Sequence, residues 1–174
     1  MVLLRATQRV LRLLPPMSPE FGESDTALGD WYVNRLVVDR RPLLLLVSSH
    51  SLLPMLVPAR DVRTLPNRLP GLVRDRLLRQ GIPADQVEAE VRAMNPVVVS
   101  ATRDRSVIGT LNEFTKDVPY HLPVNGWSES DLAMIELHMS EMPCRVSRRF
   151  EDTICPERKA PELLAARWGP CGTA

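Results

Sequence analysis

The chain opens with an apolar pattern that predicts a strand and then a helix. We expect a strand over residues 1–5 and a short helix over 8–14, which two consecutive prolines end. Residues 15–27 are polar and contain proline, glycine and acidic side chains, as is typical of a loop. The first regular elements are therefore short and are followed by a long connection.

A hairpin is predicted where two strand patterns flank a charged turn. Residues 30–38 are rich in aromatic and β-branched side chains, and Asp39, Arg40 and Arg41 then interrupt the apolar pattern. The following run, 43–48, is apolar at every position but its last, which favours a strand that is covered on both faces of its sheet.

Beyond the hairpin the pattern changes from strands to helices. Residues 49–55 are predicted as one helical turn and 56–58 as loop. Apolar side chains then recur at spacings of three and four through 64–94, with Gly81 and Pro83 at a break between two helices. Three further elements are expected: a strand over 96–101, a helix from Ser106 to near Tyr120, and a helix over 132–142.

Length and element order together predict the fold class. A chain of 174 residues fits one domain. We expect a single α+β domain over residues 1–145, with a small mixed or antiparallel sheet of about four strands covered by helices. Residues 146–174 show no sustained period apart from a short helix near 161–167, so they are predicted to form a less regular tail.

Composition is that of a folded protein without a membrane span. Hydrophobic residues make up 44% of the chain and charged residues 25%. The longest aliphatic run, 43–47, is far shorter than the roughly 20 residues that a span needs, and the N-terminus lacks the pattern of a signal peptide. We therefore expect a cytoplasmic protein with no membrane partner.

The three cysteines are too widely spaced for a paired motif: Cys144, Cys155 and Cys171. An odd number leaves one thiol over in any disulfide framework, so we expect reduced thiols. Cys144 could form a nucleophilic pair with His121 or His138, but it follows a predicted helix end, where the helix dipole raises the pKa of a thiol. A structural role for Cys144 is therefore the better interpretation.

Basic side chains concentrate in the first half of the chain, although the net charge is only +1. Arginines at or near predicted turns could form one positive rim able to hold phosphates. The members of this predicted rim are Arg40, Arg41, Arg60, Arg63, Arg103 and Arg105. Two plainer explanations stay open, because the basic half could complement the acidic middle of the domain and because turns expose charges in any protein.

A pocket is the alternative basis for a function. The predicted helix after Ser106 carries Asn112, Glu113 and His121, which could supply a general acid or base. The same helix is also consistent with a surface strip of ion pairs at three-and-four spacing, formed by Glu113, Lys116, Asp117 and Tyr120. The motifs G-x-S-x-G, G-x-G-x-x-G, G-x-x-x-x-G-K-S/T and H-E-x-x-H do not occur.

Neither a metal nor a cofactor is expected. The nearest approximation to a zinc site lies on one helix and its end, at Glu136, His138, Glu141 and Cys144. Glu136 and His138 are two residues apart and so point in different directions, whereas His138 and Glu141 share a face. A solvent-facing polar stripe is the better interpretation of this helix.

Three segments carry a resemblance to a known group. They are LGDWYVNRLVVDRRPLLLLVSSHSLLPMLVPARD at 28–61, GTLNEFTKDVPYHL at 109–122 and EMPC at 141–144. With W-x-x-N before a basic turn and a later G-x-x-N-E helix, residues 1–145 resemble a group of small bacterial proteins that form a domain of unknown function. The resemblance implies a bacterial cytosolic protein with both helices and strands, and it implies no activity, cofactor or catalytic residue.

The expected function is that of a non-enzymatic cytosolic binding or accessory protein, with a protein or polyanion partner on the arginine rim. Nucleic acid stays open as that partner, although aromatic side chains that stack bases are sparse. The alternative is a small hydrolase-like enzyme with a pocket near Asn112, Glu113 and His121. Convergence of these three side chains in a concave site would favour the enzyme, and their dispersal on the surface would favour the binding protein.

Overall fold

The predicted hairpin forms, and it sets the frame of the sheet. β2 (Trp31–Val38) and β3 (Arg41–Ser48) pair antiparallel along their whole length. Asp39 and Arg40 form the two-residue turn, with φ angles of 50° and 63°. Positive φ at both positions gives the turn a twist that matches the twist of the strand pair.

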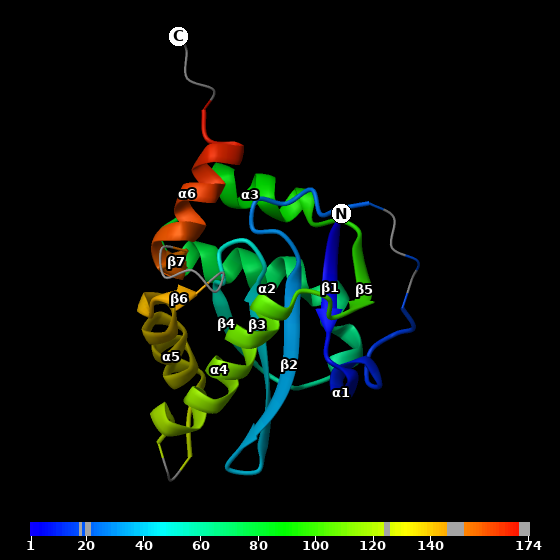
Figure 1. The fold of residues 1–174 in the computed structure, drawn as a ribbon, viewed down its shortest axis with the longest axis vertical. Coiled ribbons are helices and arrows are strands. Elements are labelled where there is room, and N and C mark those ends of the chain that lie inside the picture. The colour runs from blue at the N-terminus through cyan, green and yellow to red at the C-terminus, as the bar shows by residue number, and fades with distance from the viewer. Residues whose placement is uncertain (18, 20–21, 124–125, 146–151, 171–174) are drawn as a thin grey trace.

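The computed structural model describes residues 1–174 except 18, 20–21, 124–125, 146–151 and 171–174. Within the described residues, one mixed sheet has five strands in the order β4-β3-β2-β1-β5 (Figure 1). β1 (Val2–Ala6) pairs parallel with β2 and with β5 (Val97–Ala101), while β4 (Pro54–Pro58) pairs antiparallel with β3. The predicted α+β class with a small mixed sheet is confirmed.

The loop predicted over residues 56–58 is wrong, and the helical turn predicted over 49–55 is shorter than expected, because β4 begins at Pro54. A turn forms at 49–51, where the backbone N–H of Leu52 donates to the carbonyl of Ser48 at 3.1 Å. Leu56 of β4 lies opposite Leu45 of β3 in the sheet. A run of three apolar residues between two prolines has no period of its own, so pairing with β3 decides its conformation. This pairing adds a strand to the predicted four.

Helices cover both faces of the sheet, which explains why β3 is apolar at successive positions. Leu44 and Leu46 face one core, and Leu45 and Val47 face the other. The first core is closed by α1 (Gln8–Leu11), α2 (Leu65–Arg79), α3 (Ala84–Ala93) and α6 (Pro156–Trp168). The second core is closed by α4 (Arg105–His121) and α5 (Glu129–Glu141). In Figure 1, α4 lies on the near side of the sheet and α2 on the far side.

The long helices begin and end close to their predicted positions. Gly81, with φ of 81°, separates α2 from α3. Asp104 caps α4, since its side chain accepts a hydrogen bond from the backbone N–H of Ser106 at 2.8 Å. Ser128 and Asp131 form a capping box at the start of α5. Local sequence signals therefore place these helices correctly.

The C-terminal helix α6 is longer than the predicted 161–167 and packs into the first core. Ala160 and Leu164 are fully buried there, beside α3. The indole N–H of Trp168 donates to the buried carboxylate of Glu90 at 2.7 Å. The predicted boundary at residue 145 adjoins residues 146–151, which lie outside the described residues, as does Cys171.

Short elements complete the described part of the chain. The 3-10 helix η1 (Val62–Thr64) precedes α2, and β6 (Cys144–Arg145) pairs antiparallel with β7 (Thr153–Ile154). Among the helices of the described residues, none has both the length and the apolar character to cross a membrane.

Candidate functional site

The structure divides the six arginines of the predicted rim into two groups. The first group comes from the hairpin turn and from the segment after β4, and its members are Arg40, Arg41, Arg60 and Arg63. These two segments lie side by side, because the backbone N–H of Ala59 donates to the carbonyl of Pro42 at 3.0 Å. All four side chains are exposed at this end of the sheet.

The second group, Arg103 and Arg105, follows β5 and lies elsewhere. The register places Ala101, the last residue of β5, level with Val33 of β2. The far end of β2 is Val38, five residues further on, which corresponds to about 16 Å along a strand. The two groups therefore do not form one continuous rim.

The surface around the first group carries charges of both signs. Arg41 is fixed over Trp127, with its guanidinium carbon 5.3 Å from the ring centre and its Nη1 donating to the Trp127 carbonyl at 2.8 Å. Arg60 lies 3.8 Å from the carboxylate of Glu129, and both side chains are largely exposed. Asp39 and Asp61 are exposed in the same two segments.

The three candidates for an enzymatic pocket do not converge. Glu113 lines a pocket of about 320 Å³ between α4 and the segment that follows α5. Neither Asn112 nor His121 lines this pocket, and both are exposed on α4. The other residues that line the pocket are Phe114, Lys116, Asp117, Tyr120, Met142, Pro143 and Cys144.

Cys144 borders the same pocket as an inert thiol. Its Sγ lies 3.4 Å from the carbonyl of Met142, which accepts a hydrogen bond from it. Burial, reinforced by the negative charge of Glu113, raises the pKa of the Cys144 thiol to about 12. The thiol is therefore protonated at neutral pH, and the arrangement gives it no nucleophilic character.

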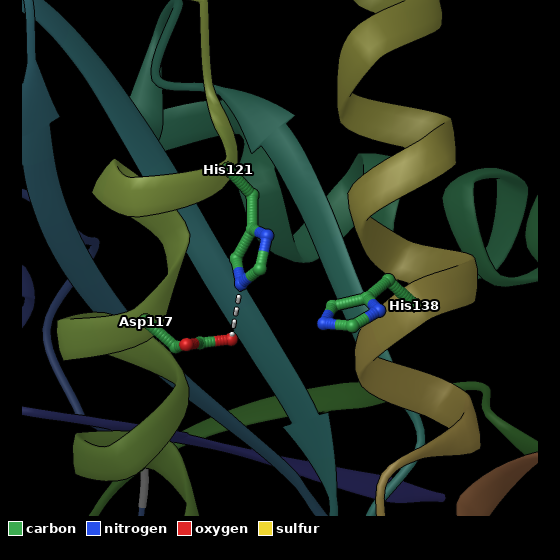
Figure 2. A group of neighbouring side chains, drawn as sticks. All are labelled: Asp117, His121 and His138. Carbon is green, nitrogen blue, oxygen red and sulfur yellow. Dashed lines mark ion pairs between the residues drawn. The ribbon is translucent and has the colours of Figure 1, made fainter.

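Three other side chains come together between the two helices of the second core. Asp117 and His121 lie one turn apart on α4, and His138 faces them from α5 (Figure 2). One ligand atom from each residue lies within 4.8 Å of the other two. The imidazole rings of His121 and His138 have centroids 4.5 Å apart and are tilted by 50°.

The Asp117 carboxylate is the least solvated member of this cluster. Its Oδ2 lies 3.1 Å from Nε2 of His121, the separation of an ion pair. The contact is an ion pair without a hydrogen bond, and among the described residues this shielded oxygen has no hydrogen-bond partner. An imidazole pair and a carboxylate in this arrangement are the donor set of many zinc and iron sites.

The sequence shows that Asp117 and His121 are close on one helix, but it does not show that His138 lies beside them. The spacing of Asp117 and His121, four residues apart on one helix, is a signal that a search for paired ligands can detect. The nearest approximation to a zinc site in the sequence instead grouped His138 with Glu136. Glu136 lies on another side of α5 and contacts β4. Only the packing of α5 against α4 brings His138 to the other two residues.

The comparisons with known proteins gave one finding. Residues 3–159 match the model of a family described as a domain of unknown function, DUF6933. No curated protein and no solved structure matched the chain.

Proposed function

The chain belongs to the DUF6933 family, a domain of unknown function, and we propose from its own geometry that it is a non-enzymatic binding protein of the bacterial cytoplasm. The dispersal of Asn112, Glu113 and His121 supports binding over catalysis, because an enzyme needs its acid and base around one substrate. The resemblance of the hairpin segment supports a bacterial source. The absence of a disulfide at Cys144 and Cys155 is compatible with a reducing compartment.

The presentation of four arginines at one end of the sheet is the observation that carries the proposal. They belong to two chain segments, at the hairpin turn and after β4, that a backbone hydrogen bond between Ala59 and Pro42 holds together. Arg41 is fixed in place by Trp127, while Arg60 is 82% exposed. A fixed arginine beside freely exposed ones can donate charge-assisted hydrogen bonds to carboxylates on a partner.

An acidic protein surface fits this end of the sheet better than nucleic acid does. Asp39, Asp61 and Glu129 lie among the arginines and would repel a continuous phosphate backbone. Trp127, the aromatic side chain beside Arg41, is only 8% exposed and therefore has no free face on which a base could stack. A protein partner with separated carboxylates can pair them with the arginines and keep them away from these three acidic side chains.

A binding titration with poly-L-glutamate at increasing salt tests the proposal. We expect binding at low salt, and a loss of about one to two units in the slope of log K against log salt for the double variant Arg40→Ser/Arg63→Ser. The matched control is Arg9→Ser/Arg12→Ser, which removes the same charge from exposed positions at α1. Equal effects of the two double variants would contradict a local site.

Nucleic acid is the competing outcome of the same experiment. Short single- and double-stranded DNA and RNA replace poly-L-glutamate in parallel titrations. A nucleic acid that binds more tightly than poly-L-glutamate, and whose binding weakens in Arg40→Ser/Arg63→Ser but not in the control variant, would indicate a nucleic-acid partner instead of an acidic protein. Absence of binding to all of the probes at micromolar protein would remove the arginine surface as a functional site.

A hydrolase-like activity remains the second candidate, and one observation favours it. Glu113 and Asp117, one turn apart on α4, both line the pocket of about 320 Å³ and could act as general acid and base. Hydrolysis of activated ester substrates that Glu113→Gln abolishes and Asn112→Ala preserves would favour this candidate. Hydrolysis that persists in Glu113→Gln would exclude it.

A further inference from the structure

We propose that Asp117, His121 and His138 form a binding site for a divalent first-row transition-metal ion, which links α4 to α5. This site is separate from the arginine surface and does not depend on it. Two nitrogen donors and one carboxylate come from two helices that pack on the same face of the sheet (Figure 2).

One distance between ligand atoms already matches that of an occupied site, and the other two are at most 4.8 Å. In a tetrahedral zinc site with bonds of about 2.0–2.1 Å, neighbouring ligand atoms are about 3.4 Å apart. Nε2 of His121 and Oδ2 of Asp117 are already 3.1 Å apart, and all three ligand atoms lie within 4.8 Å of one another. Both imidazoles are solvent-exposed, so rotations about their side-chain bonds can bring them onto an ion without moving the helices.

The Oδ2 atom of Asp117 makes an ion pair with His121 but, among the described residues, no hydrogen bond. Shielded carboxylate oxygens without a hydrogen bond are uncommon in folded proteins. Oδ2 of Asp117 is such an atom among the described residues, and it faces the two imidazoles. A cation held between these side chains would satisfy it.

The neighbouring charges are favourable for a cation. Glu113 lies one turn before Asp117 on α4, and Glu141 lies one turn after His138 on α5. Lys116, the basic side chain of this part of α4, is exposed and adjoins Asp117 in sequence. Two carboxylates in addition to the ligand carboxylate raise the local concentration of cations around the cluster.

The donor set selects the class of metal. Imidazole nitrogen suits zinc, copper, iron and nickel, whereas magnesium and calcium prefer sites built from oxygen alone. Three protein ligands leave one tetrahedral position, which water can fill because His121 and His138 are exposed. We therefore use Zn²⁺ as the probe and Mg²⁺ as the negative control.

A purely structural explanation competes with the metal site. Asp117 and His121 could form an ordinary ion pair at i and i+4, with His138 stacked against it. Such a pair on a helix surface contributes little and shows no preference for zinc. The two explanations therefore differ in metal affinity and in which histidines respond.

Calorimetric titration of the full chain with ZnCl₂ is the first test. We expect one Zn²⁺ per chain and no response to MgCl₂. We also expect the zinc affinity to fall at least about tenfold in His138→Gln and in Asp117→Asn, because loss of a group that only hydrogen-bonds to a metal ligand already lowers metal affinity by that factor. His50→Gln is the matched control, since His50 is exposed and belongs to no such cluster in the described residues. Circular dichroism checks that each variant is folded.

Histidine NMR with Zn²⁺ provides a second readout that does not depend on variants. The chain has three histidines, so each ring can be assigned. We expect Zn²⁺ to shift the ring signals of His121 and His138 and to leave those of His50 in place. Binding that shifts His50 alone, binding that survives in His138→Gln, or no binding at 100-fold excess of Zn²⁺ over protein would overturn the proposal.

Discussion

The carboxylate of Glu136 on α5 accepts a hydrogen bond from the backbone N–H of Leu56 on β4, with Oε1 2.7 Å from the nitrogen. β4 is an edge strand, and Leu56 presents this N–H on the side that has no neighbouring strand. The backbone nitrogens of Pro54 and Pro58 point to the same side of β4 as that of Leu56, and proline has no N–H. Glu136 and two prolines thus remove every outward donor from β4, which protects the edge against pairing with other chains.

Arginines on α2 hold Glu136 in place. Nη2 of Arg79 lies 2.8 Å from Oε2 of Glu136, and Nε of the buried Arg76 lies 3.5 Å from the same oxygen. Arg76 also donates to the carbonyl of Pro54 at 3.3 Å and to the hydroxyl of Ser140 at 2.8 Å. Side chains from α2 and α5 therefore meet over the edge strand in one polar network.

We expect Glu136→Ala to lower the free energy of unfolding by about 3–5 kcal/mol, because it leaves the Leu56 N–H unpaired and removes the carboxylate beside the buried Arg76. Urea denaturation followed by circular dichroism measures this loss. Glu129→Ala is the matched control at an exposed position of the same helix and is expected to change stability little. Similar losses of unfolding free energy in the two variants would show that the contact of Glu136 with β4 does not stabilise the fold.

Leu45→Ala is expected to cost about 2–5 kcal/mol, because Leu45 is fully buried in an interior strand that helices cover on both faces. The control is Val37→Ala on the neighbouring strand β2, where the side chain is 55% exposed. Equilibrium denaturation of both variants gives the comparison. A loss below about 1 kcal/mol for Leu45→Ala would be inconsistent with this packing.

Cys144 is expected to resist alkylation in the folded protein. With a pKa of about 12, the thiol stays protonated as the pH rises to 8, and only about one molecule in ten thousand carries the reactive thiolate. The variant Cys155→Ser/Cys171→Ser leaves Cys144 as the single thiol of the chain. Its reaction with iodoacetamide at pH 8 should be about a thousandfold slower than in denaturant, where the ordinary thiol pKa returns.

The same variant separates the two roles considered for this cysteine. A rate that still rises about tenfold per pH unit above pH 9, where the rate of a free cysteine levels off, is the signature of a buried structural thiol. Alkylation in the folded state as fast as that of a free cysteine would indicate an activated thiol, and it would revive the pairing of Cys144 with His121 or His138.

Local patterns determined most of the secondary structure. The period of three and four between residues 64 and 94 was sufficient to place α2 and α3, because one face of each helix must be apolar to reach the core. The uninterrupted apolar run of β3 likewise predicted burial on both faces. These features depend on neighbours in sequence, so the sequence alone could reveal them.

Tertiary structure decided the features that depend on distant residues. β4 became a strand through pairing with β3 and through Glu136, which is 80 residues away from Leu56. The predicted arginine rim was divided because β5 ends level with Val33, near the start of β2, whereas the hairpin turn follows the end of β2. Strand register and helix packing set both outcomes, and neither leaves a periodic mark on the sequence.

The candidate sites also combine features that the sequence determines locally with features that depend on distant residues. The sequence alone placed arginines at the hairpin turn, and it placed Asp117 on one helical strip with Glu113, Lys116 and Tyr120, since both follow from local geometry. It did not pair Asp117 with His121. It could not bring His138 to that face, because the position of α5 against α4 depends on how both helices pack on the sheet. A site made by two elements exists only once the core between them has formed, since packing of that core fixes their relative position.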